Sequence, residues 1–244
     1  MVKIDLNCDM GESFGRYTLG DDEVLMPLIT SANVACGWHA GDPLVMDRTI
    51  RLAKQHDVSV GAHPGHHDLQ GFGRREIDLS PEEAESFVLY QIGALYALAK
   101  ANGVELTHVK PHGALYNQAA KDEALARGIS RGVARFSNSL ILIGLAGSAL
   151  IRAGEESGLR VANEGFPDRA YNGDGTLMSR KLPGAVLKSV DQVAANAVRI
   201  AKEGVGGHRI DTLCIHGDNA HAPAFAKAVQ AALHQNNILI ERLA

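Results

Sequence analysis

The sequence predicts an α/β fold in which parallel strands close, or nearly close, into a TIM-like (β/α) barrel. Eight short apolar runs alternate with longer helical patterns along the 244 residues. The runs are apolar on both faces, as buried parallel strands are. Ionisable side chains follow six of the runs. A barrel draws its site from many strand ends, whereas an open doubly wound sheet gathers its site at one switch point, so the barrel is favoured.

The predicted strands are these apolar runs, taken in chain order. They cover residues 2–6, 32–35, 58–62, 106–109, 140–144, 159–162, 212–215 and 238–240. Because a helical pattern separates most of them, neighbouring strands are expected to run parallel.

The clearest predicted helix begins after Ser80. Ser80 suits the N-cap, Pro81 suits the first helical position, and Glu83 completes a capping box. An apolar stripe then continues until Gly103, a residue that favours a helix end. Similar stripes predict helices over residues 43–55, 122–136, 147–156, 190–201 and 223–234. No linker or internal repeat interrupts these elements, so one domain is expected over residues 1–244.

The composition excludes several classes of protein. A net charge of −4 provides no basic surface for nucleic acid or an anionic membrane. No run approaches the roughly 20 apolar residues that span a bilayer, and the N-terminus lacks the apolar core of a signal peptide. Three scattered cysteines favour neither a disulfide framework nor a structural zinc site. We therefore expect a cytoplasmic protein without nucleic-acid or membrane partners.

Polar and ionisable side chains gather just after the predicted strands. The carboxyl ends of barrel strands meet at one mouth, so these side chains are expected to share a pocket. Glycines flank many of them and allow the backbone to turn sharply or approach a ligand. The group comprises Asn7, Asp9, Glu12, Asn33, Cys36, His39, Asp42, His63, Lys110, His112, Glu164, Asp168, Arg169, His216, Asp218 and Asn219.

Histidines carry much of the functional interpretation of this group. A lone histidine after a strand is more often a structural residue than a catalyst. Convergence of several on one barrel face favours function, because unrelated structural histidines need not share that face. The four in question are His39, His63, His112 and His216. By contrast, His66 and His67 lie in a Gly- and Asp-rich loop and are expected to be solvated.

Lys110 and Cys36 each have two interpretations. Lys110 follows an apolar run, so its ammonium is expected to face a ligand and stabilise a carboxylate, phosphate or oxyanion; the alternative is a surface lysine. Cys36 lies close to His39 and could act as a nucleophile. A small buried packing residue is the favoured interpretation of Cys36, and also of Cys8 and Cys214.

Several catalytic motifs are missing from the sequence. It contains no G-x-x-x-x-G-K-[ST] phosphate-binding loop and no G-x-G-x-x-G. It also contains no G-x-S-x-G nucleophile elbow and no H-E-x-x-H zinc motif. Any nucleotide that the protein uses is therefore bound in another way.

Motifs spread over the chain in order make the sequence resemble the LamB/YcsF family. They extend from Lys3 to about Asn219 and so cover nearly the whole sequence. The motifs are NCDMGESFG at 7–15, SANVACG at 31–37 followed by HAGD at 39–42, GAHP at 61–64, VKPHGALYN at 109–117, EGF at 164–166 followed by DRAY at 168–171, and IHGDN at 215–219.

The resemblance implies a fold and a reaction. The implied fold is a barrel of the glycoside hydrolase/deacetylase type, often incomplete, with seven strands. The implied role is that of the A subunit of an ATP-dependent 5-oxoprolinase, which hydrolyses 5-oxo-L-proline (pyroglutamate) to L-glutamate coupled to ATP hydrolysis. The 5-oxoprolinase subunits B and C are the implied partners, and ATP, with Mg²⁺, is expected to be bound mainly by them.

For that substrate, we expect a catalytic set of Asp9, Glu12, His39, His63, Lys110 and His112. Asp9 or Glu12 would act as the base and Lys110 would stabilise negative charge, while the histidines orient water or donate a proton. The substrate-binding set is expected to be Asn7, Asn33, Glu164, Arg169, His216, Asp218 and Asn219. Arg169 or Asn219 would hold the substrate carboxylate, and Arg169 would do so best, as a bidentate fork.

Two functions from other classes stay open. The first is a metal-dependent, deacetylase-like hydrolase of a carbohydrate or small amide. There Asp9 or Asp42 would join His39 and His63 around a divalent ion. The second is a non-catalytic scaffolding subunit, which would not need so many ionisable groups in one cleft because burying them is costly. A homo-oligomer is compatible with each of these functions.

Overall fold

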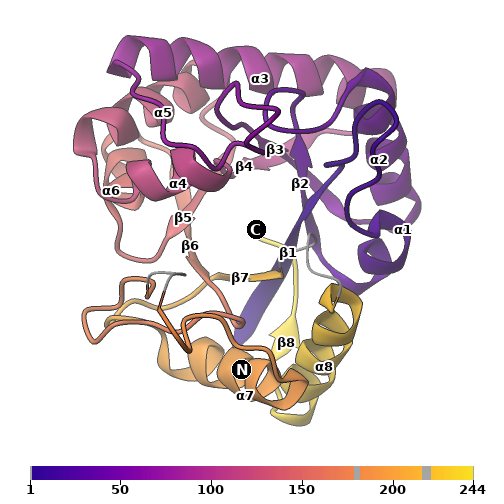
Figure 1. Ribbon diagram of the computed structural model, residues 1–244, viewed down its shortest axis with the longest axis vertical. Helices are drawn as coiled ribbons and strands as arrows, with labels where there is room; N and C mark the ends of the chain where they lie inside the picture. Colours follow the sequence, from indigo (N-terminus) through magenta and orange to yellow (C-terminus); the bar gives the residue numbers. More distant parts are fainter. Residues whose placement is uncertain (1, 179–181, 216–220, 244) are drawn as a thin grey trace.

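The computed structural model describes residues 2–178, 182–215 and 221–243, and within them seven parallel strands close into a barrel (Figure 1). Each strand pairs with the next along the chain, and β1 closes the ring by pairing with both β2 and β7. The strands of the ring are β1 (Lys3–Met10), β2 (Ser31–Ala35), β3 (Ser59–His63), β4 (Leu106–Val109), β5 (Ile141–Leu145), β6 (Arg160–Gly165) and β7 (Thr212–Ile215). A short β8 (Leu239–Ile240) pairs only with the N-terminal end of β1. The expected TIM-like, seven-stranded barrel is therefore confirmed.

Helices surround the strands, with α3 along one side and α7 and α8 along the opposite side (Figure 1). The six longer ones, all anticipated from the sequence, are α2 (Pro43–Gln55), α3 (Pro81–Ala101), α5 (Glu123–Phe136), α6 (Ala149–Glu156), α7 (Val190–Glu203) and α8 (Ala222–Gln235). Three short elements were not anticipated because they are too short to show an apolar stripe: α1 (Asp22–Leu25), η1 (Met26–Leu28) and α4 (Gly113–Ala119). No helix in the described ranges is long and apolar enough to cross a bilayer.

The start of α3 shows why the sequence signals were informative. The Ser80 side chain accepts a hydrogen bond from the Glu83 backbone N–H, and the Glu83 carboxylate accepts one from the Ser80 backbone N–H. This is the expected capping box. The helix ends just before Gly103, whose φ of +65° suits a residue without a side chain.

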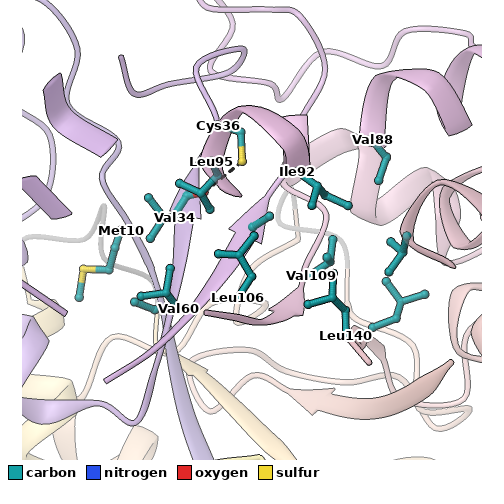
Figure 2. Close-up of a cluster of buried hydrophobic side chains, with 14 of the residues drawn as sticks. Met10, Val34, Cys36, Val60, Val88, Ile92, Leu95, Leu106, Val109 and Leu140 are labelled. Carbon is teal, nitrogen blue, oxygen red and sulfur yellow. Dashed lines mark hydrogen bonds between the residues drawn. The ribbon is translucent and has the colours of Figure 1, made fainter. Parts of the chain in front are cut away.

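The main hydrophobic core lies between the strands and the helices that cover them. Val34 and Val60 of neighbouring strands pack with Ile92 and Leu95 of α3 (Figure 2). Cys36 lies in the same cluster, 3% exposed, and its Sγ is 3.3 Å from the Val34 carbonyl oxygen. Burial raises the pKa of the Cys36 thiol to about 12. The packing interpretation of Cys36 therefore holds, and a thiolate nucleophile at this position is disfavoured.

One wall of the barrel interior is polar instead of apolar. On β1, Asp5, Asn7 and Asp9 alternate with apolar residues and face inward. Because β1 continues to Met10, Asn7 and Asp9 lie inside the strand, not after it as expected. The opposite wall is apolar and is built from Ile141, Ile143 and Ala162. A polar column inside the barrel therefore leads up to the mouth.

Candidate active site

The centre of the site is an ion cluster around Lys110, directly after β4. The Lys110 ammonium lies 3.0 Å from Asp9 Oδ1, 2.8 Å from Glu164 Oε1 and 3.1 Å from Asn7 Oδ1. Cys214 Sγ is also 3.1 Å away. Burial opposes the charged form, but attraction to Asp9, with Cys214 and Glu164, outweighs it and raises the pKa of Lys110 well above its usual value. Lys110 is therefore a permanently charged ammonium.

Asp9 is the carboxylate of this cluster that reaches toward solvent. Its Oδ1 accepts hydrogen bonds from Lys110 and from Asn33 Nδ2, the latter at 2.9 Å. Its Oδ2 lies 3.3 Å from His63 Nε2, and 13% of the side chain is exposed. Burial opposes ionisation, but the His63 imidazole and the Lys110 charge lower the pKa of Asp9 well below its usual value. Asp9 is thus an ionised carboxylate with one oxygen held and the other facing the histidines.

Three histidines form a compact group beside Asp9. His63 Nδ1 donates a hydrogen bond to the Lys110 carbonyl oxygen at 2.6 Å, and His112 Nε2 donates to the Phe72 carbonyl oxygen at 2.9 Å. The remaining nitrogens, His63 Nε2 and His112 Nδ1, lie 3.0 Å apart. His39 stacks on His112, with ring centroids 3.8 Å apart and planes 3° from parallel. We call His39, His63 and His112 the imidazole group.

Glu12 closes the other side of the imidazole group. Its Oε1 lies 3.4 Å from His39 Nε2 and 3.6 Å from His112 Nδ1. Burial, with further contributions from neighbouring histidines, lowers the pKa of His39 well below its usual value and that of His112 to about 3. Both rings are therefore neutral near pH 7. The site combines two carboxylates, one ammonium and neutral imidazoles within a few ångströms.

A glycine allows the loop after β3 to pack against the stacked rings. At Gly73 an added Cβ would lie 2.7 Å from His39 Cβ and 2.9 Å from His112 Cδ2. Gly73 also has a φ of +62°, which residues with side chains rarely adopt. The close approach of this loop brings the Phe72 carbonyl within reach of His112.

A cavity of about 240 Å³ opens above Asp9 and Lys110. His63 and His112 line it on one side, and Phe166 gives it an apolar wall. Two guanidinium groups, those of Arg74 and Arg169, also line the cavity. Arg169 is held in place by donating to the Ala185 and Met178 carbonyl oxygens. The cavity suits a small anionic molecule with an apolar part.

The structure brings most of the predicted site residues together. The catalytic set lies at the mouth of the barrel, in contact across β1, β3 and β4: Asp9, Glu12, His39, His63, Lys110 and His112. Of the predicted substrate-binding residues, Arg169 reaches the cavity. Asn7, Asn33 and Glu164 are fully buried and contact the ion cluster from inside the barrel. Three predicted residues lie outside the described ranges: His216, Asp218 and Asn219.

Asp42 is not part of this group. It is the N-cap of α2, and its Oδ1 accepts hydrogen bonds from the Leu44 and Val45 backbone N–H groups, both at 2.9 Å. Its Oδ2 accepts from the Gly15 backbone N–H at 2.7 Å. Both oxygens are thus used to hold the backbone, because the residue precedes Pro43 at a helix start. An Asp–Pro signal of this kind was available in the sequence.

Sequence reasoning missed several residues of the site region. His108 lies inside the barrel with Nε2 2.9 Å from Asn33 Oδ1; alternation along β4 places it on the same face as Lys110 and could have revealed it. Cys214 contacts Lys110, so it is more than a packing residue. His66 was expected to be solvated, which is wrong: it is 1% exposed, and its Nε2 lies 2.7 Å from Gln118 Oε1.

Fold and site together define a (β/α)-barrel enzyme with a charged pocket at the mouth of the barrel. The sequence pattern of the LamB/YcsF family matches residues 4–244, and the chain therefore belongs to that family. It is 53% identical to the A subunit of 5-oxoprolinase from Pyrococcus horikoshii, over 98% of this chain and 97% of the relative.

Solved structures agree with this family membership. The lactam utilization protein from Thermus thermophilus is 46% identical and superposes with a TM-score of 0.94, over 99% of this chain and all of the other. A polysaccharide deacetylase from Bacillus cereus superposes with a TM-score of 0.52 over 100% of this chain and 93% of the other. That deacetylase is 13% identical and so shares the fold alone.

Proposed function

We propose that this chain is the A subunit of an ATP-dependent 5-oxoprolinase and that the cavity at the barrel mouth opens the lactam ring of 5-oxo-L-proline. One observation carries the proposal: an ionised carboxylate (Asp9), a buried ammonium (Lys110) and an imidazole (His63) converge on one small cavity. Amide hydrolysis needs groups that orient water, stabilise developing charge and move protons. The full-length similarity to a protein named as part of a 5-oxoprolinase supports the substrate.

The geometry refines the role of Lys110. An ammonium has three N–H donors, and Asp9, Glu164 and Asn7 all lie within 3.1 Å of Lys110 Nζ. Lys110 therefore has no donor left for the oxyanion of a substrate. Its charge instead fixes Asp9 and provides a positive potential at the floor of the cavity.

Asp9 then orients the attacking water. Its Oδ1 is held by Lys110 and Asn33, so Oδ2 and His63 face the cavity together. Water adds to the lactam carbon, the ring C–N bond breaks, and the nitrogen takes up a proton, which gives the amino group of glutamate. The guanidinium groups of Arg74 and Arg169 attract the substrate carboxylate.

ATP activation takes place with partner subunits in this proposal. The lactam is an unstrained, resonance-stabilised amide, so phosphorylation of its oxygen would create a good leaving group. This sequence has neither a phosphate-binding loop nor a G-x-G-x-x-G motif. Binding of ATP and Mg²⁺ mainly by subunits B and C, in the cytoplasm, accounts for that. The name of the similar protein, which designates one lettered subunit, supports a multi-subunit enzyme.

The test is glutamate formation from 5-oxoproline and ATP by this chain, with and without subunits B and C. Glutamate is expected only in the complete mixture, together with stoichiometric ADP. A complete, folded mixture that makes no glutamate would overturn the assignment of the substrate.

A second candidate is a metal-dependent, deacetylase-like hydrolase of a carbohydrate or small amide. The observation that favours it is a group of four potential metal ligands whose donor atoms lie within 4.8 Å of one another: Glu12, His39, His63 and His112. This candidate predicts release of acetate from N-acetylated sugars without ATP and loss of that activity on chelation. Acetate release that is absent, or unaffected by chelation, would eliminate it.

A further inference from the structure

We propose that His63, His112 and Glu12 bind a divalent transition-metal ion of the zinc class at the edge of the cavity. The proposal concerns a binding site and holds whether or not lactam hydrolysis is the reaction. The donor atoms are His63 Nε2, His112 Nδ1 and Glu12 Oε1. Imidazole nitrogens with a carboxylate oxygen are a donor set that suits zinc.

Main-chain carbonyls fix which ring nitrogens carry hydrogen. A carbonyl oxygen accepts hydrogen bonds and cannot donate. His63 Nδ1 must therefore carry the proton that it donates to the Lys110 carbonyl, and His112 Nε2 must carry the one that it donates to the Phe72 carbonyl. In a neutral ring the other nitrogen then holds a lone pair. These two lone-pair nitrogens are the pair that lies 3.0 Å apart.

Two lone pairs at that separation repel unless a cation lies between or beside them. A shared proton is one such cation, and a metal ion is the other. Burial disfavours the proton, since it holds the pKa of His112 at about 3. The fixed orientation of each imidazole by a carbonyl acceptor is also how metal-binding histidines are usually held.

The donor separations fit one small ion. A tetrahedral zinc site with bonds of about 2.0–2.1 Å places its donors about 3.4 Å apart. Here His63 Nε2 and His112 Nδ1 are 3.0 Å apart, and His112 Nδ1 is 3.6 Å from Glu12 Oε1. Asp9 Oδ2, 3.3 Å from His63 Nε2, lies at the same edge and adds negative charge.

His39 does not share the ion with His112 in this arrangement. Imidazole binds a metal in the plane of its ring, and these two rings are stacked 3.8 Å apart with planes 3° from parallel. We assign His39 to positioning: it packs against His112 and lies 3.4 Å from Glu12 Oε1. The cavity lined by His63 and His112 gives the ion a route from solvent.

The experiment titrates Zn²⁺ alone into the full-length, chelator-stripped chain by calorimetry, with no lactam, ATP or partner subunit present. One ion per chain is expected. Each of His63→Gln and His112→Gln should weaken binding by about tenfold or more. His66→Gln is the matched control, since His66 is buried to the same degree but contacts Gln118 outside the imidazole group. It should bind Zn²⁺ like the wild type.

Anomalous diffraction at the zinc edge keeps the proposal testable if a variant does not fold. In wild-type crystals soaked with Zn²⁺, a peak between His63 Nε2 and His112 Nδ1 is expected. The proposal is overturned if no stoichiometric Zn²⁺ binds, if both variants bind like the wild type, or if the peak lies elsewhere. Because lactam hydrolysis is not measured, failure of the proposed function and failure of this site are distinguishable.

Discussion

At the scale of single residues, the most consequential one is Lys110, a buried cation held between two carboxylates. Asp9 and Glu164 lie within 3.0 Å of its ammonium. A buried charge whose partner is removed is strongly destabilising, whereas the intact pair adds little net stability. Lys110 therefore fixes the site more than it stabilises the fold.

Lys110→Met is expected to lower the free energy of unfolding by about 3–5 kcal/mol, because it leaves two carboxylates without their counter-ion. Adding Asp9→Asn should restore part of the loss, since contacting residues couple. Urea titration of the two single variants and the double variant measures this. Strictly additive losses would show that Asp9 and Lys110 do not interact.

Thiol reactivity provides a second prediction at this scale. The three cysteines are buried, and burial raises the pKa of each thiol, that of Cys36 to about 12. Thiolate is the reactive form. The native protein should therefore resist alkylation near neutral pH, and the unfolded chain should take up three equivalents. Rapid alkylation of Cys36 in the folded protein would reopen its role as a nucleophile.

At the scale of elements, the barrel depends on close approaches at particular glycines. Gly61 of β3 faces the His108 ring, and a Cβ there would overlap the ring. Gly93 of α3 has nothing within 4 Å of the position of an added Cβ. The two glycines therefore offer a matched pair of substitutions with opposite expected effects.

Gly61→Ala is expected to destabilise the protein by more than about 2 kcal/mol, because an overpacked interior must distort. Gly93→Ala should stabilise it by about 0.5–1 kcal/mol, since alanine is the better helix former. Thermal and urea unfolding of both variants gives the comparison. A neutral Gly61→Ala would mean that His108 moves freely inside the barrel.

The N-cap of α2 gives a prediction with a pH dependence. Asp42→Ala should cost about 1 kcal/mol near neutral pH. Hydrogen bonds from backbone N–H groups, that of Gly15 first, lower the pKa of Asp42 in the folded state. Its stabilising effect is thus fully present above its unfolded pKa of about 3.9 and is lost as pH falls through the lower folded value. Urea unfolding should show the wild-type advantage shrinking in that acidic range and not between about pH 5 and 8.

At the scale of the whole molecule, the sequence predicted the strands and long helices because their apolar patterns and caps are local. It placed the end of β1 too early, since Asn7 and Asp9 look like loop residues but face a polar barrel interior. It grouped the catalytic candidates correctly because strand ends of a barrel share one mouth. It could not show that Asp42 caps a helix while Glu12 reaches the histidines, because that depends on tertiary contacts.

The central claim is that the cluster around Asp9 performs the hydrolysis. The most direct measurement compares Asp9→Asn with Asp47→Asn in the reconstituted complex, using kcat/KM for glutamate formation from 5-oxoproline. Asp47 pairs with Arg51 on α2, away from the cavity, so its variant should keep wild-type activity. Asp9→Asn should lose about 100-fold or more, the scale on which general acid–base groups act. An Asp9→Asn enzyme with near-normal turnover would contradict the account.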